Sequence, residues 1–306
     1  NVPPAADTLA LVEKIKRESQ NTAIVVPQSP ATSPSIAKPA PPLPSALGNL
    51  PRPLTSFIGR GPALAEVRRV ITQLDPDSGL PIHPLVTIVG QGGSGKTRLA
   101  IQVARELAAQ YLHGAWWVEL APLNDGALVL PAIAKSIGVK ESPEQTLIEA
   151  MLHYLRDKRL LIVLDNCEHL LMACAHLAET LLRACPHLQI LATSREAFGT
   201  LSALTWRVPA LSDDDALQLF ANRARHARHD FVLTPHNAPV VAAICAHLDS
   251  MPLAIELAAA RVRALSVEQI AERLTDRLNL LTSARTTAAP RQQTLRATID
   301  WSYALL

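Results

Sequence analysis

Residues 90–97, with the sequence GQGGSGKT, directly follow the apolar run LVTIV at residues 85–89. They match the phosphate-binding pattern G-x-x-x-x-G-K-[ST], which binds phosphate where it joins a strand to a helix. Backbone N–H groups of such a loop line a concavity, and the start of the following helix adds partial positive charge. The pattern therefore predicts a site for a nucleoside triphosphate and strongly disfavours a plain glycine-rich turn.

Each position of this loop has an expected role. Lys96 would reach the β- and γ-phosphates, and the Thr97 hydroxyl would bind Mg²⁺. The residues expected to contact the nucleotide here are Gly90, Gln91, Gly92, Gly93, Ser94, Gly95, Lys96, Thr97 and Arg98.

Apolar runs alternate with amphipathic segments from residue 54 to 210. Strands are expected at 85–89, 116–120, 160–164, 188–192 and near 206–208, and helices at 63–74, 96–109, 127–137, 143–156 and 169–184. Strands that alternate with helices form a parallel α/β sheet. Later patterns are helical, at 212–226, 239–248, 252–264 and 266–281. We therefore expect an α/β phosphate-loop domain at 54–210, followed by an all-α helical lid domain at 211–290.

Both ends of the sequence suggest a piece of a longer protein. Residues 1–19 have the pattern of an amphipathic helix, which we expect to complete an upstream helical domain. Residues 20–53 are expected to be an extended linker, because nine of the 24 prolines lie between 27 and 53. The chain begins with Asn1 and ends on two leucines, which favours truncation at both ends.

A carboxylate follows the apolar run at residues 160–164. Asp165 stands where the carboxyl end of a parallel strand delivers side chains to a ligand, so we expect it to hold Mg²⁺ opposite Thr97. Hydrolysis also needs a group that activates water. The residue after Asp165 is Asn166, which cannot accept a proton, and the nearest acid is Glu168. Either Glu168 is the base, or hydrolysis is slow and the domain works as a switch.

Arg195 follows the expected strand at 188–192. If that strand lies between the phosphate-loop strand and the Asp165 strand, Arg195 projects toward the γ-phosphate. Otherwise it is a surface arginine at the end of a strand. The expected catalytic set is Lys96, Asp165, Glu168 and Arg195.

Six segments occur in a characteristic order. They are FIGR at residues 57–60, GQGGSGKTRLA, LLIVLDNCEHL, ILATSRE, LSDDDALQLF and MPLAIELAAARV. Together they resemble the STAND class of signal-transduction ATPases with an NB-ARC-like module, as in bacterial transcriptional regulators of the antibiotic-regulator (SARP) and LuxR-like types. The resemblance covers roughly residues 50–306.

This resemblance implies roles for further residues. Phe57, Ile58 and Arg60 match the segment that lines the adenine pocket, although Gly61 replaces the usual acid. Arg195 matches the sensor arginine. Pro252 matches the proline of a helical-domain motif that packs on adenine, although Ser250 replaces its first glycine. Residues 291–306 would begin a truncated winged-helix domain.

The resemblance also implies a cytoplasmic ATP/ADP switch. ADP would hold the α/β and helical domains closed, and ATP would release them for self-association.

A nearly balanced charge, 29 Lys and Arg against 27 Asp and Glu, argues against DNA binding by this fragment, so DNA contact would lie in domains outside it. A turnover enzyme, such as a small-molecule kinase or a transport ATPase, is the alternative. No apolar run approaches a membrane span.

Other residue clusters give weaker patterns. The residues His226, His229 and His236 suggest a metal site only by spacing that is common by chance, and the arginines beside them repel cations. A nucleophilic pair of Cys167 and His169 would need a third orienting group. The four cysteines form no C-x-x-C pair, which favours reduced thiols. Trp116 and Trp117 suggest one core and one partly exposed ring better than a base-stacking platform.

Overall fold

The computed structural model describes residues 48–141, 143–199 and 203–274. The chain divides into two compact units, one spanning Ala46–Leu211 and another that includes the chain from Ser212 onward. We call the described part of the first the α/β unit and the described part of the second, residues 212–274, the helical unit. The helix expected at 1–19, most of the expected linker and the expected winged-helix start lie outside the described residues.

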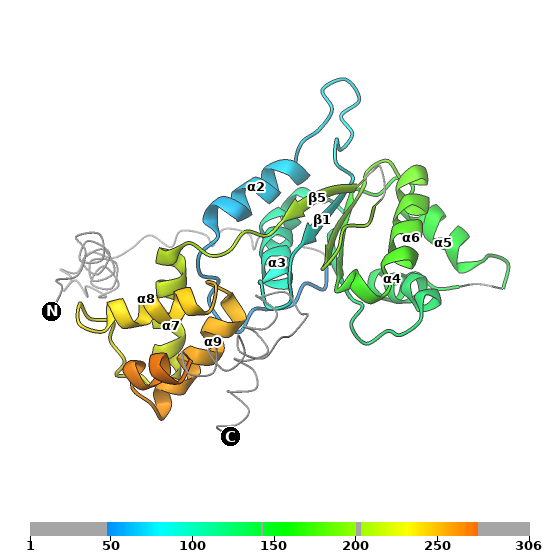
Figure 1. Ribbon diagram of the computed structural model, residues 1–306. Coiled ribbons are helices and arrows are strands. Elements are labelled where there is room, and N and C mark those ends of the chain that lie inside the picture. Colours follow the sequence, from blue (N-terminus) through cyan, green and yellow to red (C-terminus); the bar gives the residue numbers. More distant parts are fainter. Residues whose placement is uncertain (1–47, 142, 200–202, 275–306) are drawn as a thin grey trace, which may run out of the picture. The chain divides into compact units, whose positions relative to one another are not determined.

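The α/β unit contains a five-stranded sheet with the order β2-β3-β4-β1-β5. All neighbouring strands are parallel, which confirms the predicted α/β fold (Figure 1). The strands are β1 (Leu85–Val89), β2 (Ala115–Glu119), β3 (Leu160–Asp165), β4 (Leu188–Ser194) and β5 (Ala203–Arg207). Strand β4 lies between β1 and β3, so the strand order meets the condition on which the prediction for Arg195 depended.

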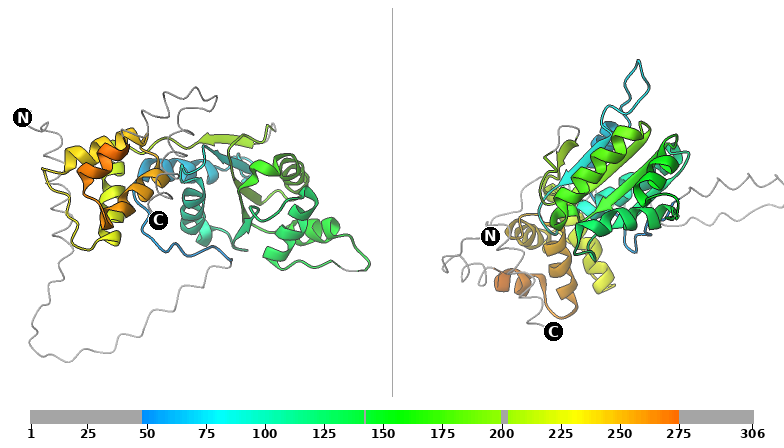
Figure 2. Two further views of the ribbon diagram at one scale, coloured as in Figure 1. Left: turned by 60° about the horizontal axis from the view of Figure 1, so that its bottom comes forward. Right: turned by 90° about the vertical axis from the view of Figure 1, so that its right-hand side faces the viewer.

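Helices cover both faces of this sheet. Helices α2 (Gly61–Ile71) and α3 (Lys96–Leu107) lie on one face, as Figures 1 and 2 show. Helices α4 (Val129–Ile137), α5 (Leu147–Leu155) and α6 (Leu171–Ala184) lie on the other. Short 3₁₀ turns occupy η1 (Ala108–Gln110), η2 (Gly126–Leu128) and η3 (Cys167–His169).

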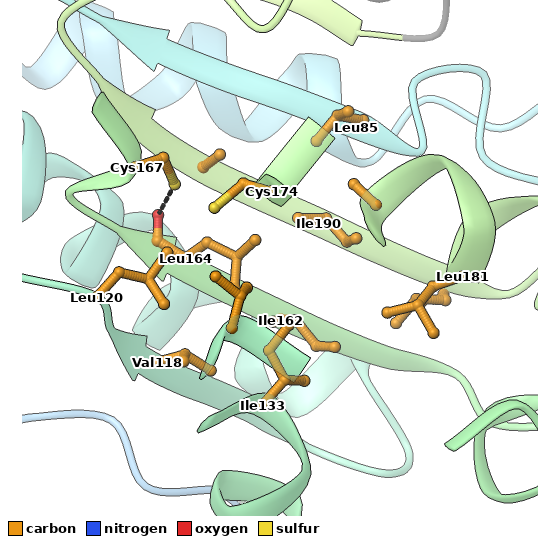
Figure 3. Close-up of a cluster of buried hydrophobic side chains, with 14 of the residues drawn as sticks. Leu85, Val118, Leu120, Ile133, Ile162, Leu164, Cys167, Cys174, Leu181 and Ile190 are labelled. Atoms are coloured by element: carbon orange, nitrogen blue, oxygen red, sulfur yellow. Dashed lines mark hydrogen bonds between the residues drawn. The ribbon is translucent and has the colours of Figure 1, made fainter. Parts of the chain in front are cut away.

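The central strand β3 shows why its sequence is continuously apolar. Its side chains alternate between two cores, since successive residues of a strand point to opposite faces. Ile162 and Leu164 pack in the core beneath α4–α6 (Figure 3), and Leu161 and Val163 pack in the core beneath α2 and α3. A strand covered on both faces has no position at which a polar side chain would meet water.

Two of the differences from the sequence-based boundaries have a clear structural cause. Helix α5 begins at Leu147 rather than at 143, because Thr146 and Glu149 form a capping box: the Thr146 N–H donates to Glu149 Oε2 at 2.9 Å. The α/β unit also begins before Leu54. Asn49 Nδ2 donates to the Trp117 carbonyl at 2.9 Å, and Asn49 Oδ1 accepts the Trp117 N–H at 2.6 Å. The end of the proline-rich segment is therefore fastened to β2.

The helical unit is built around its first helix. Its helices are α7 (Asp213–Ala227), α8 (Ala238–His247) and α9 (Pro252–Ala260), then the turn η4 (Arg261–Arg263), and residues 267–274 are helical. Ser212 caps α7 by accepting the Asp215 N–H at 3.2 Å, and acids in its first turn complement the helix dipole. The ring centroids of Phe220 and Phe231 lie 6.1 Å apart.

Among the described residues, no helix combines the length and apolarity needed to cross a bilayer.

Candidate phosphate-binding site

The loop at residues 90–97 joins β1 to α3 at the carboxyl edge of the sheet. Gly93 (φ 77°) and Gly95 (φ 87°) adopt left-handed backbone conformations, which glycine enters without strain. Gly95 directly precedes α3. The first N–H groups of a helix lack partners within it, so this end of α3 offers donors and partial positive charge to an anion.

Lys96 is held inside the loop. Its ammonium group donates to the carbonyls of Gly90 at 2.9 Å and Gln91 at 3.0 Å. Burial lowers the pKa of Lys96, the negative charge of Glu168 raises it, and Arg195 lowers it further. The structure therefore brings the expected cations and the acid Glu168 into one electrostatic cluster.

Asp165 meets Thr97 across the edge of the sheet. The Thr97 hydroxyl donates to Asp165 Oδ1 at 2.8 Å, and the carboxylate is largely buried. A second hydroxyl, that of Thr193 on β4, donates to the same oxygen at 2.6 Å. Thr193 also accepts the N–H of Asn166 at 3.0 Å. The candidate Mg²⁺ ligands lie together, and Thr193 orients the carboxylate between them.

Thr193 is a residue of the site that the sequence pattern does not predict. In the sheet, Leu164 pairs with Ala192, so the next residues on the two strands, Asp165 and Thr193, stand side by side. Nothing in the local pattern of residues 188–194 marks this hydroxyl. Only the adjacency of β3 and β4 reveals it, and a sequence-based argument could have found it by assuming that order.

Arg195 and Glu168 form an ion pair beside the loop. Arg195 Nε donates to Glu168 Oε1 at 3.0 Å. A Cβ atom at Gly92 would lie 3.9 Å from Arg195 Nη2, so the guanidinium borders the phosphate loop. Asn166 lies between Asp165 and the turn η3, which contains Glu168. Its φ of 66° is a left-handed conformation that asparagine tolerates.

Several enclosed oxygens around the loop have no hydrogen-bond partner among the described residues. They are Gln91 Oε1, Ser94 Oγ and Glu168 Oε2. Buried polar atoms are nearly always paired, so three orphans around one loop indicate a polar ligand shell. A serine hydroxyl can donate to a phosphate, and the two acceptor oxygens suit water bound to a cation. The residues present therefore fit a nucleotide phosphate with hydrated Mg²⁺.

The expected adenine segment is anchored to this loop through two arginines. Arg60 is buried and donates to the carbonyls of Ser94 at 2.7 Å and Pro209 at 3.0 Å. Arg98 donates to the carbonyl of Ser56 at 2.7 Å. Both arginines therefore hold backbone segments in place.

Phe57 and Ile58 are half-buried, and Phe57 packs against the core beneath α2 and α3. Their contact with adenine stays a prediction. Pro252 lies in the helical unit, in the first turn of α9, and its expected contact with adenine also stays a prediction. Ser250 has φ 49°, so the residue that replaces the motif's glycine adopts a conformation that glycine enters more easily.

The weaker candidate sites have structural roles. No group of three or more His, Cys, Asp or Glu side chains within the described ranges is arranged to hold a metal. A hydrogen bond with Cys174 and burial raise the pKa of the Cys167 thiol. His169 Nε2 lies 2.8 Å from the Leu123 carbonyl oxygen, which makes it a loop anchor. Trp116 and Trp117 are both half-buried and pack against opposite cores.

Comparisons with known proteins agree on a family. Residues 64–230 match the NB-ARC domain family. An HTH-type transcriptional regulator of Mycobacterium tuberculosis is 49% identical over 223 residues, which cover 72% of this chain and 25% of that protein. The regulatory protein AfsR of Streptomyces griseus is 28% identical over 288 residues, which cover 90% of this chain and 27% of AfsR. The chain thus spans about a quarter of the length of these regulators.

A solved structure shares the fold. Drosophila ORC bound to DNA aligns with a TM-score of 0.53 and 11% sequence identity, covering 74% of this chain and 68% of that one. At that identity the likeness concerns the fold alone.

Proposed function

The chain belongs to the NB-ARC family of P-loop nucleotide-binding domains, and from this premise we propose that it is the ATP- and ADP-controlled switch of a larger regulator. One observation supports this proposal above the others. The Thr97 hydroxyl and the Asp165 carboxylate lie 2.8 Å apart beside a loop in which Gly93 and Gly95 adopt left-handed conformations. This is the donor set that an Mg²⁺–nucleotide complex requires.

The proposed roles follow from these contacts. The loop N–H groups and Lys96 bind the phosphates, and Thr97 and Asp165 hold Mg²⁺. When bound, Mg²⁺ neutralises charge on the β- and γ-phosphates. Arg195 contacts the γ-phosphate, and Phe57, Ile58 and Pro252 contact adenine. Arg60 and Arg98 are proposed to lie at the nucleotide, and they also hold backbone carbonyls of neighbouring segments.

We propose slow hydrolysis, because the position after Asp165 lacks a proton acceptor. Asn166 can hydrogen-bond water without deprotonating it. The nearest acid, Glu168, is engaged by Arg195 through Nε. Nucleotide exchange would then reset the switch, and a nucleotide shifts it only through different affinities for its two conformations.

The larger protein is proposed to be a cytoplasmic transcriptional regulator. This rests on the names of the relatives, of which the chain spans about a quarter. DNA contact would belong to parts outside this sequence, and ATP would favour self-association. A turnover enzyme would need a site for an acceptor, and no feature of the described residues assigns one.

Thermal unfolding with saturating nucleotide and Mg²⁺ tests this proposal. Ligand at 100 times its Kd adds about 2.7 kcal/mol of stability, which should raise the Tm by about 5–10 °C. Lys96→Ala should remove most of this shift, and Lys140→Ala, which changes an exposed lysine, should preserve it. Unmoved melting curves for the unaltered chain would contradict nucleotide binding. Turnover near ~1 s⁻¹ with an acceptor would indicate a kinase instead.

A further inference from the structure

The ion pair between Glu168 and Arg195 lies beside the phosphate loop. We propose that Glu168 is a positioning residue, which aims Arg195 at the γ-phosphate and thereby sets the preference for ATP over ADP. This inference rests on the proposed function.

The two residues have unequal freedom. The side chain of Arg195 is 61% exposed and that of Glu168 only 17%. Glu168 belongs to η3, directly after β3, and its backbone is fixed by that turn. A long exposed arginine carries considerable rotamer entropy, which it loses when it binds a phosphate. An enclosed carboxylate that already holds the guanidinium reduces that loss.

The atoms that are engaged determine which way the guanidinium faces. Arg195 uses Nε to reach Glu168 Oε1, at 3.0 Å. Its Nη2 lies beside the loop, 3.9 Å from where a Cβ of Gly92 would stand. Bonding through Nε leaves both Nη groups available. These donors can form a pair of hydrogen bonds to the oxygens of one phosphate.

Other nearby acids are unsuited to this task. Asp165 Oδ1 accepts from Thr97 and Thr193. Glu196, the next residue after Arg195, is exposed, and no side-chain contact joins it to the guanidinium among the described residues. Glu168 is therefore the carboxylate that fixes Arg195. Glu196 provides a matched control, because it has the same charge without the contact.

The test is a double-mutant cycle on equilibrium binding to the full chain. Binding of a non-hydrolysable ATP analogue and of ADP is measured for the unaltered chain, Glu168→Ala, Arg195→Ala and the double variant. Losing one pre-ordered side chain costs about 0.5–1.5 kcal/mol, which corresponds to a loss of about twofold to twelvefold in affinity. We expect Glu168→Ala to weaken the analogue by this factor more than it weakens ADP.

The cycle also predicts how the substitutions combine. In the Arg195→Ala background, Glu168→Ala should not weaken binding of the analogue further, because the guanidinium that Glu168 positions is already absent. Glu168→Gln keeps an oxygen that can accept from Nε, so it should retain most of the preference. Glu196→Ala should change neither affinity. Rescue by glutamine separates positioning from a folding defect, which would weaken both nucleotides.

Several results would overturn the proposal. Tighter binding of the analogue by Glu168→Ala would show that Glu168 competes with the γ-phosphate. Equal weakening of both nucleotides, or additive losses in the cycle, would show that it does not act through Arg195. If the unaltered chain binds neither nucleotide, the proposed function fails together with the inference. If it binds both and the preference is unmoved, only the inference fails.

Discussion

A matched pair of threonine-to-valine substitutions tests the polar anchor of Asp165. Thr193 on β4 and Thr87 on β1 are both fully buried, on neighbouring strands. Thr193 donates to Asp165 at 2.6 Å and accepts the Asn166 N–H at 3.0 Å. The Thr87 hydroxyl has no partner among the described residues. Valine has nearly the same shape, so each substitution changes mainly the hydroxyl.

The expected magnitudes follow from these partners. A hydrogen bond to a carboxylate contributes about 1.5–3 kcal/mol, and the stranded Asn166 N–H adds roughly 1 kcal/mol, less where water reaches it. Thr193→Val should therefore lower the free energy of unfolding by about 2–4 kcal/mol. Thr87→Val removes an unpaired buried hydroxyl, so it should be neutral or stabilise by up to about 1 kcal/mol.

Tryptophan fluorescence during thermal unfolding without nucleotide measures both effects. Trp116, Trp117 and Trp206 lie in the α/β unit, so the signal reports largely on that unit. At about 2–4 °C per kcal/mol, Thr193→Val should lower the Tm by about 4–16 °C. Thr87→Val should leave it unchanged or raise it. Equal shifts for the two variants would refute the reasoning, because the hydrogen bonds of Thr193 would then contribute nothing.

Two further substitutions test water activation and the anchoring of the loop. Asn166→Asp keeps a residue that tolerates the left-handed backbone at φ 66°. It should raise single-turnover ATP hydrolysis with little change in nucleotide affinity, since a positioned general base contributes ~10²–10⁴-fold to the rate. If Asn166→Asp gives no gain and Glu168→Gln loses turnover, Glu168 is the base instead. Arg60→Ala should lower the free energy of unfolding by about 2–3 kcal/mol, because two backbone carbonyls lose a charged donor. Arg69 is exposed, so Arg69→Ala should leave the free energy of unfolding unchanged. Similar denaturation midpoints for the two variants would show that Arg60 does not anchor the loop.

The sequence determined the features that depend on local order along the chain. Glycines, lysine and threonine at fixed spacing after an apolar strand define the phosphate loop, since neighbouring residues make it. The continuous apolar run before Asp165 indicates a strand buried on both faces, and every residue of β3 is buried in the structure. The alternation of strands and helices sufficed for a parallel sheet, because each element carries its own periodicity.

Tertiary structure decided the distant contacts that no motif predicts. Arg195 and Glu168 are 27 positions apart, Thr193 and Asp165 28, and Arg60 and Pro209 149. Each contact depends on strand order or on where a connecting segment crosses the sheet edge. The apolar pattern of a strand specifies that it is buried without specifying its neighbour. Hydrophobic burial is non-directional, so it assembles the layers, and only the assembled sheet brings these polar partners within hydrogen-bonding distance.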